Sequence, residues 1–427
     1  MNERVVITGF GIVSSLGFDL RTYWDALLLG RSAIQPWQPK GITDFPVKYA
    51  ASVADEAFAR AFSDLPELRA PMERRTRFGM AAAARALQDA SLVGAGSAGT
   101  VLGVAMGSGV PERCPEDMFL ALGPEEGPCW RRWFTRRESR SLAHRHGNDH
   151  LSASIARHHR CTGPVLNLNT ACAGAAHALG LSFRALRRGE AECMLAGGAD
   201  SVLNILTMGA LLLLGAPSTS EDHGDRLCRP FDLQRSGLVA AEGAAVAVLE
   251  RERHARTRGA RVYAEVCGYG SSLDAYRITA PHPEGAGAAL AMRGALTDAG
   301  LRPDEVDYIN AHGTSTPLND KSETLAIKTV FAEGDHFQRL LVSSTKSQIG
   351  HMIAAAGAPE FIATAMALHT GMVPATINLD TPDPECALDY VPHRPRDASP
   401  RTAISNSFGF GGINACLALR RFIGWSA

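Results

Sequence analysis

The sequence predicts an α/β fold made of two similar halves. Short runs rich in β-branched residues alternate with alanine-rich runs of helical spacing along the 427 residues, which is the pattern of an α/β protein. A chain of this length is long for one simple core. The stretches RVVITGFGIVSSLG (4–17) and RVYAEVCGYGSSLD (261–274) also resemble each other. We therefore expect two core-forming halves, residues 1–258 and 259–427, joined near residues 251–260.

Strands and helices alternate through the first half. Apolar runs that end at glycine or polar residues indicate strands, and apolar residues at helical spacing indicate helices. The expected strands span residues 4–11, 100–109, 163–171 and 191–200, and the expected helices span 76–92 and 173–189. A helix–strand pair over residues 295–313 repeats this pattern in the second half.

Composition and charge argue against several classes of protein. Lysine and arginine number 43 against 44 acidic residues, so a nucleic-acid-binding chain is not expected. The nine cysteines form no C-x-x-C pair, which argues against a disulfide framework and a zinc ribbon. The N-terminus lacks the features of a signal peptide, and the most apolar stretch, residues 205–215, is too short to span a bilayer. We expect a cytoplasmic protein with no membrane partner.

Cys172 lies where an apolar, extended run meets an alanine-rich helical run, in NLNTACAGAAHALG (167–180). Its small neighbours allow a sharp strand-to-helix turn and leave room for a substrate beside the sulfur. A helix N-terminus lowers the pKa of a thiol and offers free N–H groups to an oxyanion, so the position favours a nucleophile. The alternative is a small buried residue, as most free cysteines are.

Two histidines stand beside glycine at the end of an apolar run. His312 precedes Gly313 and three hydroxyl residues, and His351 follows Gly350 at the start of an alanine-rich helix. Glycine removes backbone crowding where a ligand could approach, so both histidines are candidates for catalysis. The other twelve histidines are interpreted as core or surface residues.

A glycine-rich turn between two expected strands, ISNSFGFGGINACLAL (404–419), contains Phe408 and Phe410. Two aromatic rings in such a turn indicate a movable gate or a wall against an acyl chain. The turn has no G-x-G-x-x-G, and the chain has no G-K-[ST] or H-E-x-x-H, so nucleotide-binding and zinc-peptidase functions are not expected. Residues 110–150 lack a clear period and are interpreted as a cap or an interface.

Four blocks occur together and in this order: TACAGA, NAHGTSTPLND, KSQIGHMIAAAG and SNSFGFGGINA. With RPFDLQRSGLVAAEGAAVAVLE (229–250) and TAPHPEGAGAALAM (279–292), they resemble the elongating β-ketoacyl-[acyl-carrier-protein] synthases over nearly the whole chain. The resemblance implies a thiolase fold, in which duplicated halves stack in five layers, α-β-α-β-α. It also implies a homodimer.

The resemblance assigns roles to residues of these blocks. Cys172 is implied as the nucleophile, and its backbone N–H with that of Phe410 as the oxyanion hole. His312 and His351 would donate hydrogen bonds to an enolate, and Lys346 would orient and polarise the region of His312. The other implied residues are Glu323 as the ion-pair partner of Lys346, Phe410 as a gate, and Thr314, Thr316, Phe408, Phe410 and Val110 in substrate and phosphopantetheine binding.

The implied reaction is a decarboxylative Claisen condensation. An acyl thioester on Cys172 would react with malonyl-[acyl-carrier-protein] and extend a fatty-acid or polyketide chain by two carbons. The expected partner is an acyl carrier protein, whose phosphopantetheine carries the substrates, so neither a metal nor an organic cofactor is expected. Residues 110–150 leave the acyl chain length and the pathway open.

Three other functions fit the residues less well. A chain-length-factor-like subunit would lack the active cysteine, a degradative thiolase would carry a cysteine in SFGFGG, and an initiating synthase would use Cys-His-Asn. The non-catalytic chain-length-factor-like subunit is kept as the alternative. A heterodimer with a related subunit stays open beside the homodimer.

Some positions depart from the pattern of the family. Ala241 replaces a glycine, and Pro359 falls inside an expected helix, where it predicts a kink or a local break. Seven arginines would form either a basic patch for the acidic carrier protein or surface with ion pairs inside the chain. They are Arg74, Arg75, Arg77, Arg131, Arg132, Arg136 and Arg137.

Overall fold

The computed structural model describes residues 3–39, 41–70, 72–96, 98–110 and 147–425, with the short strands β5 (Leu122–Gly123) and β6 (Gly127–Pro128). Its main sheet has the strand order β12-β11-β15-β16-β10-β1-β9-β8-β4-β7. The first half contributes β1 (Val5–Val13), β4 (Leu102–Gly107), β7 (Val165–Leu168), β8 (Cys193–Asp200) and β9 (Gly243–Arg251). The second half contributes β10 (Ala264–Leu273), β11 (Tyr308–Asn310), β12 (Leu341–Ser343), β15 (Thr402–Gly409) and β16 (Ile413–Arg421).

Both sets of five strands are paired in the same way. In the first set, β1–β9 and β9–β8 are antiparallel, whereas β8–β4 and β4–β7 are parallel. In the second set, β10–β16 and β16–β15 are antiparallel, whereas β15–β11 and β11–β12 are parallel. The expected duplicated halves are thereby confirmed. The domain boundary after residue 258, just past α10 (Glu252–Thr257), stays a prediction.

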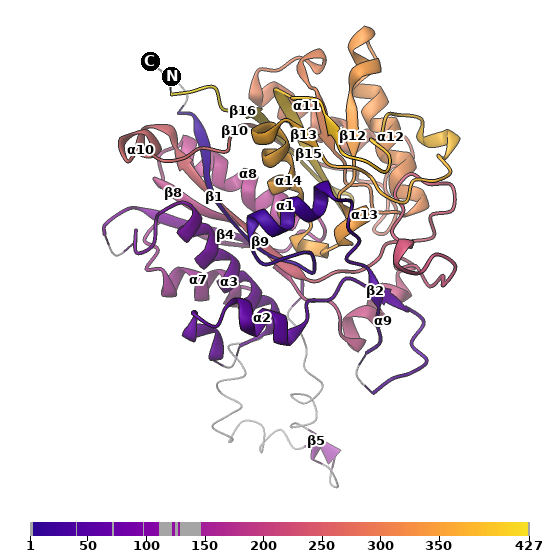
Figure 1. The fold of residues 1–427 in the computed structure, drawn as a ribbon, viewed down its shortest axis with the longest axis horizontal. Helices are drawn as coiled ribbons and strands as arrows, with labels where there is room; N and C mark the ends of the chain where they lie inside the picture. Colours follow the sequence, from indigo (N-terminus) through magenta and orange to yellow (C-terminus); the bar gives the residue numbers. More distant parts are fainter. Residues whose placement is uncertain are drawn as a thin grey trace.

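The helices complete the five layers. In the middle layer, α8 (Gly174–Arg187) and α14 (Gly357–Thr370) contact each other and strands of both halves. One outer layer contains α3 (Arg74–Asp89) and α7 (His150–His158), and the other contains α11 (Ala286–Ala299) and α12 (Pro317–Phe331). Figure 1 shows the two halves side by side, with both chain termini at one corner.

Shorter elements surround these layers. The helices are α1 (Leu20–Leu28), α2 (Asp55–Ala61), α9 (Ile205–Leu213) and α13 (Lys346–Ile349). The paired strands are β2 (Gln35–Pro36) with β3 (Tyr49–Ala50), and β13 (Met372–Val373) with β14 (Arg396–Asp397).

The resemblance between residues 4–17 and 261–274 reflects a packing arrangement that both halves share. Both β1 and β10 contain a β-bulge, and each then presents a glycine to a helix. A Cβ on Gly11 would lie 1.9 Å from the carbonyl oxygen of Ala82 in α3, and one on Gly270 would lie 2.1 Å from that of Ala291 in α11. Glycine is therefore required for the helix to approach the strand. The packing therefore aligns Gly11 with Gly270. Aligning the Ser-Ser-Leu runs instead shifts the two stretches by two residues relative to this structural alignment.

Pro359 does not kink a helix. The helix expected from Met352 onward begins only at Gly357, after a short 3₁₀ turn over Ile353–Ala355. Pro359 therefore lies in the first turn of α14, where backbone N–H groups have no partner within the helix. The predicted local break is present, because the expected helix is interrupted at Ala356, just before the turn that contains Pro359. The other possibility, a kink within α14, is wrong, since a proline ring is accommodated in a first turn.

Of the two possibilities for the seven arginines, ion pairs inside the chain are confirmed for two. Arg74 forms ion pairs with Asp55 and Glu242, and Arg75 is buried in an ion pair with Glu73. Both guanidinium groups are therefore used inside the chain. Arg77 is half-buried, with its guanidinium over the ring of Phe58, whereas Arg131, Arg132, Arg136 and Arg137 lie outside the described residues.

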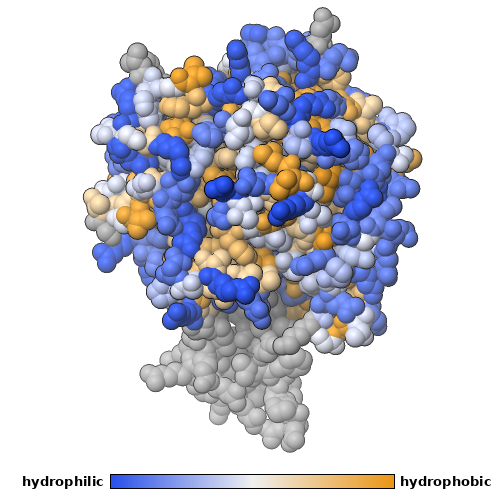
Figure 2. Space-filling view, in the orientation of Figure 1, coloured by the Kyte–Doolittle hydropathy of each residue, from blue (hydrophilic) through white to orange (hydrophobic). Residues whose placement is uncertain are grey.

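Among the helices of the described ranges, none combines the length and apolar composition that crossing a membrane requires. On the face drawn in Figure 2, hydrophilic residues predominate and hydrophobic residues occur in separate groups.

Candidate active site

Cys172 lies in a tight turn between β7 and α8, two residues before the helix begins at Gly174. Ala171 adopts a left-handed conformation with φ 46°. The N–H groups of Ala173 and Gly174 donate to the carbonyl oxygens of Thr170 and Ala171 at 3.1 and 3.0 Å. Such a conformation persists only when its surroundings hold it, and it is common at functional sites. The predicted strand-to-helix turn is therefore present.

The turn between β15 and β16 packs directly against Cys172. A Cβ on Gly409 would lie only 3.0 Å from the Cys172 nitrogen, so the two backbones are in close contact. The backbone N–H of the next residue, Phe410, is near enough to the Cys172 sulfur to favour its thiolate form. The N–H groups of Cys172 and Phe410 are thus neighbours, which is the arrangement that an oxyanion hole needs.

The expectation of a lowered thiol pKa is wrong. Cys172 is 5% exposed, and its burial raises the pKa of the thiol to about 12. The nearby Lys346 ammonium and the Phe410 N–H favour the thiolate, but the loss of hydration outweighs them. In the free protein Cys172 is therefore a neutral thiol at physiological pH.

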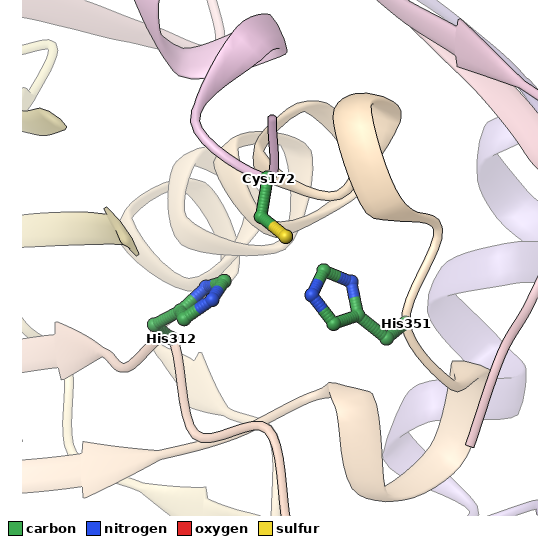
Figure 3. Close-up of side chains that lie close together, drawn as sticks. All are labelled: Cys172, His312 and His351. Carbon is green, nitrogen blue, oxygen red and sulfur yellow. The ribbon is translucent and has the colours of Figure 1, made fainter. Parts of the chain in front are cut away.

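His312 and His351 meet at Cys172. His312 follows β11, and His351 follows α13. The Cys172 sulfur and one nitrogen of each ring lie within 4.8 Å of one another, and the two ring centroids are 5.3 Å apart at 86°. Figure 3 shows the sulfur between the two imidazoles. Three segments that are far apart in the sequence thus converge on one point.

Both imidazoles are neutral and have a defined tautomer. The backbone N–H of Ile353 donates to Nδ1 of His351 at 3.1 Å, and the Lys346 ammonium lies 3.2 Å from Nδ1 of His312. Since Nδ1 accepts in each ring, Nε2 carries the proton. Burial, with the charge of Lys346, holds the pKa of both rings well below the usual range. The site thus presents two neutral N–H donors.

The same three side chains have the donor set of a cation site. Their hydrogen bonds fit a cation poorly. A ring whose Nδ1 accepts from the Ile353 N–H has no lone pair on Nε2, and the Lys346 ammonium beside His312 repels positive charge. The geometry favours hydrogen-bond donors over metal ligands.

Lys346 pairs with Glu360 and not with Glu323, so that predicted ion pair is wrong. The fully buried Lys346 ammonium contacts the Glu360 carboxylate and donates to the His312 carbonyl oxygen at 2.6 Å. Glu323 instead accepts the backbone N–H groups of His312 and Gly313, each at 2.8 Å, and an N–H of Asn406 at 3.1 Å. Glu323 therefore holds the backbone of His312, while Glu360 neutralises Lys346.

A pocket of about 300 Å³ leads to this centre. Its lining includes most of the predicted site residues: Cys172, His312, His351, Thr314, Thr316, Phe408 and Phe410. The Thr314 and Thr316 hydroxyls lie 2.8 Å apart, and apolar side chains such as Leu214, Ile278 and Leu318 also line the pocket. Val110 is 62% exposed and is not among the lining residues, so its role stays a prediction.

Sequence reasoning missed two buried acids that position the site. Glu360 lies 14 residues after Lys346, and Asp320 accepts the backbone N–H groups of Thr314 and Phe231, both at 2.9 Å. A glutamate in the otherwise apolar helix after KSQIGH was the available signal for Glu360. The signal for Asp320 was weaker, because an aspartate in the first turn of a helix is common.

Family models match both halves of the chain. The model described as "Beta-ketoacyl synthase, N-terminal domain" matches residues 2–255, and "Beta-ketoacyl synthase, C-terminal domain" matches residues 263–380. Among curated proteins, 3-oxoacyl-[acyl-carrier-protein] synthase 2 of Coxiella burnetii is 39% identical over 424 residues, covering 98% of this chain and 99% of its own. The protein of the same name from Synechocystis sp. is 39% identical over 421 residues and covers 98% of each chain.

Solved structures of similar fold cover nearly the whole chain. One is the "type II PKS acyl-carrier protein in complex with its ketosynthase bound to the hexaketide", at 31% identity and TM-score 0.87, covering 99% of this chain and 100% of that one. Another is the "ishigamide ketosynthase/chain length factor", at 34% identity, TM-score 0.85 and the same coverage. A beta-ketoacyl synthase from Burkholderia phymatum has 32% identity and TM-score 0.87, and the match covers 98% of this chain and 100% of that one.

Proposed function

Because the chain belongs to the β-ketoacyl synthase family, we propose that it is a 3-oxoacyl-[acyl-carrier-protein] synthase, an acyltransferase that condenses an acyl group with malonyl-[acyl-carrier-protein]. One observation carries the proposal. A buried cysteine faces two neutral imidazole N–H donors, with the Phe410 N–H at its sulfur, in a pocket that reaches all three side chains. The curated relatives carry the name of this activity.

Acyl loading is the first step. The Cys172 sulfur attacks the thioester carbonyl of the acyl carrier protein, and the N–H groups of Cys172 and Phe410 stabilise the oxyanion. Because the thiol is neutral, its proton leaves during the attack and ends on the departing phosphopantetheine thiol. Thr314 and Thr316, whose hydroxyls stand in the pocket, bind the phosphopantetheine arm, and Phe408 and Phe410 bound the pocket beside Cys172.

Decarboxylation and condensation follow. The malonyl group loses CO₂, and the enolate oxygen accepts hydrogen bonds from Nε2–H of His312 and His351. The enolate carbon attacks the acyl-Cys172 carbonyl, the C–S bond breaks, and the Cys172 thiolate takes up a proton. The product is a β-ketoacyl thioester longer by two carbons. These steps use side chains, backbone N–H groups and the carrier protein's own phosphopantetheine, and we propose no metal or organic cofactor.

The protein's assembly and location belong to the same proposal. A carrier-protein partner is supported by the solved ketosynthase complex with an acyl-carrier protein. A homodimer through β7 is supported by its place at the end of the sheet with Val165 44% exposed, because an open strand edge pairs readily. A cytoplasmic location agrees with free thiols at all seven cysteines of the described residues.

Intact-protein mass spectrometry tests the function. The purified protein is incubated with acyl and malonyl carrier proteins beside Cys172→Ala. We expect an acyl adduct on the wild type only, with a product two carbons longer. A product without an adduct would contradict the role of Cys172. Absence of both with every acyl group would favour the non-catalytic, chain-length-factor-like alternative, against which the intact Cys172, His312 and His351 argue.

A further inference from the structure

The turn that follows His351 has a strained backbone. Ile353 has φ 45°, in the left-handed region that β-branched residues rarely adopt. In this conformation its N–H donates to Nδ1 of His351 at 3.1 Å. The tautomer and the orientation of His351 thus depend on a turn that needs an outside contact to keep its shape.

The outside contact comes from Asp200, the last residue of β8. This side chain is buried, and its Oδ2 accepts the backbone N–H of Ala354 at 3.0 Å. Its Oδ1 accepts the N–H of Ser201 at 2.9 Å. Ala354 directly follows Ile353, so the Asp200 carboxylate fixes the strained turn from a strand 154 residues away in the sequence.

The surroundings of Asp200 leave room for a carboxylate and keep it mostly ionised at neutral pH. A Cβ on Gly109 would lie 2.7 Å from Oδ2, so a larger residue there would displace the carboxylate. Burial raises the pKa of Asp200 to about 6, while the Ala354 N–H and the guanidinium of Arg75 oppose this rise. Asp200 is therefore mostly ionised at pH 7 to 8, and its bond to Ala354 is charge-assisted and strong.

We propose that Asp200 is a positioning residue for His351: its bond to Ala354 holds the Ile353 turn, and the turn aims the His351 Nε2–H at the enolate. The inference rests on the proposed function, because it concerns the step in which His351 acts. It also separates two half-reactions. Acyl loading uses the N–H groups of Cys172 and Phe410 and is independent of His351, whereas decarboxylation of malonyl carrier protein requires His351.

The two half-reactions of Asp200→Ala are measured separately. Loading is followed as the acyl adduct on Cys172, and decarboxylation as conversion of malonyl to acetyl carrier protein. We expect decarboxylation to fall about tenfold to a hundredfold, less than the ~10²–10³ for complete loss of such a donor, since His351 is present but misaligned. Loading should not fall by more than about threefold, because removing the Asp200 charge favours the Cys172 thiolate.

Asp89→Ala is the matched control. The Asp89 carboxylate also accepts a backbone N–H, that of Phe10 at 2.9 Å. Asp89 is the last residue of α3 and lies about 20 Å along this helix from Arg75, the arginine whose charge acts on Asp200, so it is far from the site. It should leave the ratio of the two half-reactions unchanged. If Asp200→Ala does not fold, Asp200→Asn replaces it, because asparagine has the same size as aspartate. The two half-reactions are compared in the same way, and the expected loss of decarboxylation is smaller.

A coupling experiment addresses the strain itself. Glycine adopts a positive φ without cost, so Ile353→Gly makes the turn less dependent on Asp200. In that background, Asp200→Ala should lower decarboxylation by a smaller factor than in the wild type. Equal slowing of both half-reactions, or no change in either, would overturn the inference and leave the proposed function standing. A wild-type protein that performs neither half-reaction would overturn both.

Discussion

At the residue scale, the charge state of Cys172 determines how the first step can run. A buried thiol with a pKa of about 12 is not ionised before the substrate binds. The thiol proton must therefore leave the sulfur while the sulfur attacks. In the proposed reaction the phosphopantetheine substrate supplies the proton acceptor, since its departing thiolate is formed beside Cys172. The neutral thiol thus ties nucleophile activation to the presence of substrate.

Alkylation of Cys172 reports this charge state. Below its pKa the thiolate fraction of a thiol rises about tenfold per pH unit. With the pKa raised to about 12, the rate of carboxamidomethylation of Cys172 should keep rising from pH 7 to pH 10 without a plateau. The measurement is peptide mass spectrometry after timed alkylation. A plateau near pH 8 would show that the helix N-terminus, and not burial, determines the pKa of the Cys172 thiol.

The Lys346–Glu360 pair makes a second residue-scale prediction. Both side chains are fully buried, so Glu360→Gln leaves an ammonium without its counter-charge and should lower the free energy of unfolding by about 3–5 kcal/mol. Denaturant unfolding measures this change. Glu385→Gln is the control. The ion pair of Glu385 with Lys321 is exposed, so its loss should lower the free energy of unfolding by only about 0–1 kcal/mol. Equal losses in the two variants would contradict the role of burial.

At the scale of elements, the local sequence predicted which segments form helices and strands, but it did not predict where each helix begins. The helix after His351 begins five residues later than its apolar spacing indicates. Residues 352–356 instead form the turn that Asp200 holds, and that carboxylate belongs to another strand. A hydrogen bond to a side chain far away in the sequence leaves no mark in the local spacing.

Pro359 makes an element-scale prediction. In the first turn of α14 its missing N–H removes no helical hydrogen bond, so Pro359→Ala should change stability by less than about 1 kcal/mol. A proline at Ala363, in the interior of the same helix, should cost about 3 kcal/mol or more. Thermal unfolding of Pro359→Ala and Ala363→Pro makes the comparison. Strong stabilisation by Pro359→Ala would mean that the proline strains the helix after all.

At the scale of the whole molecule, the two halves join through a short pairing of β10 with β1, and the sheet ends at β7 and β12. At β12 the N–H of Val342 donates to the Asp389 carbonyl oxygen. At β7 the carbonyl oxygens of Pro164 and Leu168 face β4, so the N–H of Val165 points away from the sheet. Within the described residues no further strand lies beside β7, so this edge supports the proposed homodimer.

Val165→Pro tests whether a second copy pairs there. Proline removes only the outward N–H and is compatible with an edge strand, so each chain should still fold. We expect the wild type to be a dimer by light scattering and Val165→Pro to shift towards monomer. Val165→Thr, which keeps the N–H, should remain a dimer. A Val165→Pro protein that stays dimeric would place the interface elsewhere.

The sequence by itself determined the α/β class and the duplicated halves, because these follow from local periodicity. It also determined Cys172, His312 and His351 as the candidate site residues, because short blocks of neighbouring residues mark them. Only the tertiary structure decided that Glu360 and not Glu323 pairs with Lys346. It also decided that the Cys172 thiol is neutral and that Asp200 reaches the turn after His351. The physical reason is that ion pairing and the loss of hydration depend on distances between segments far apart in the chain, and these distances exist only after the halves have packed.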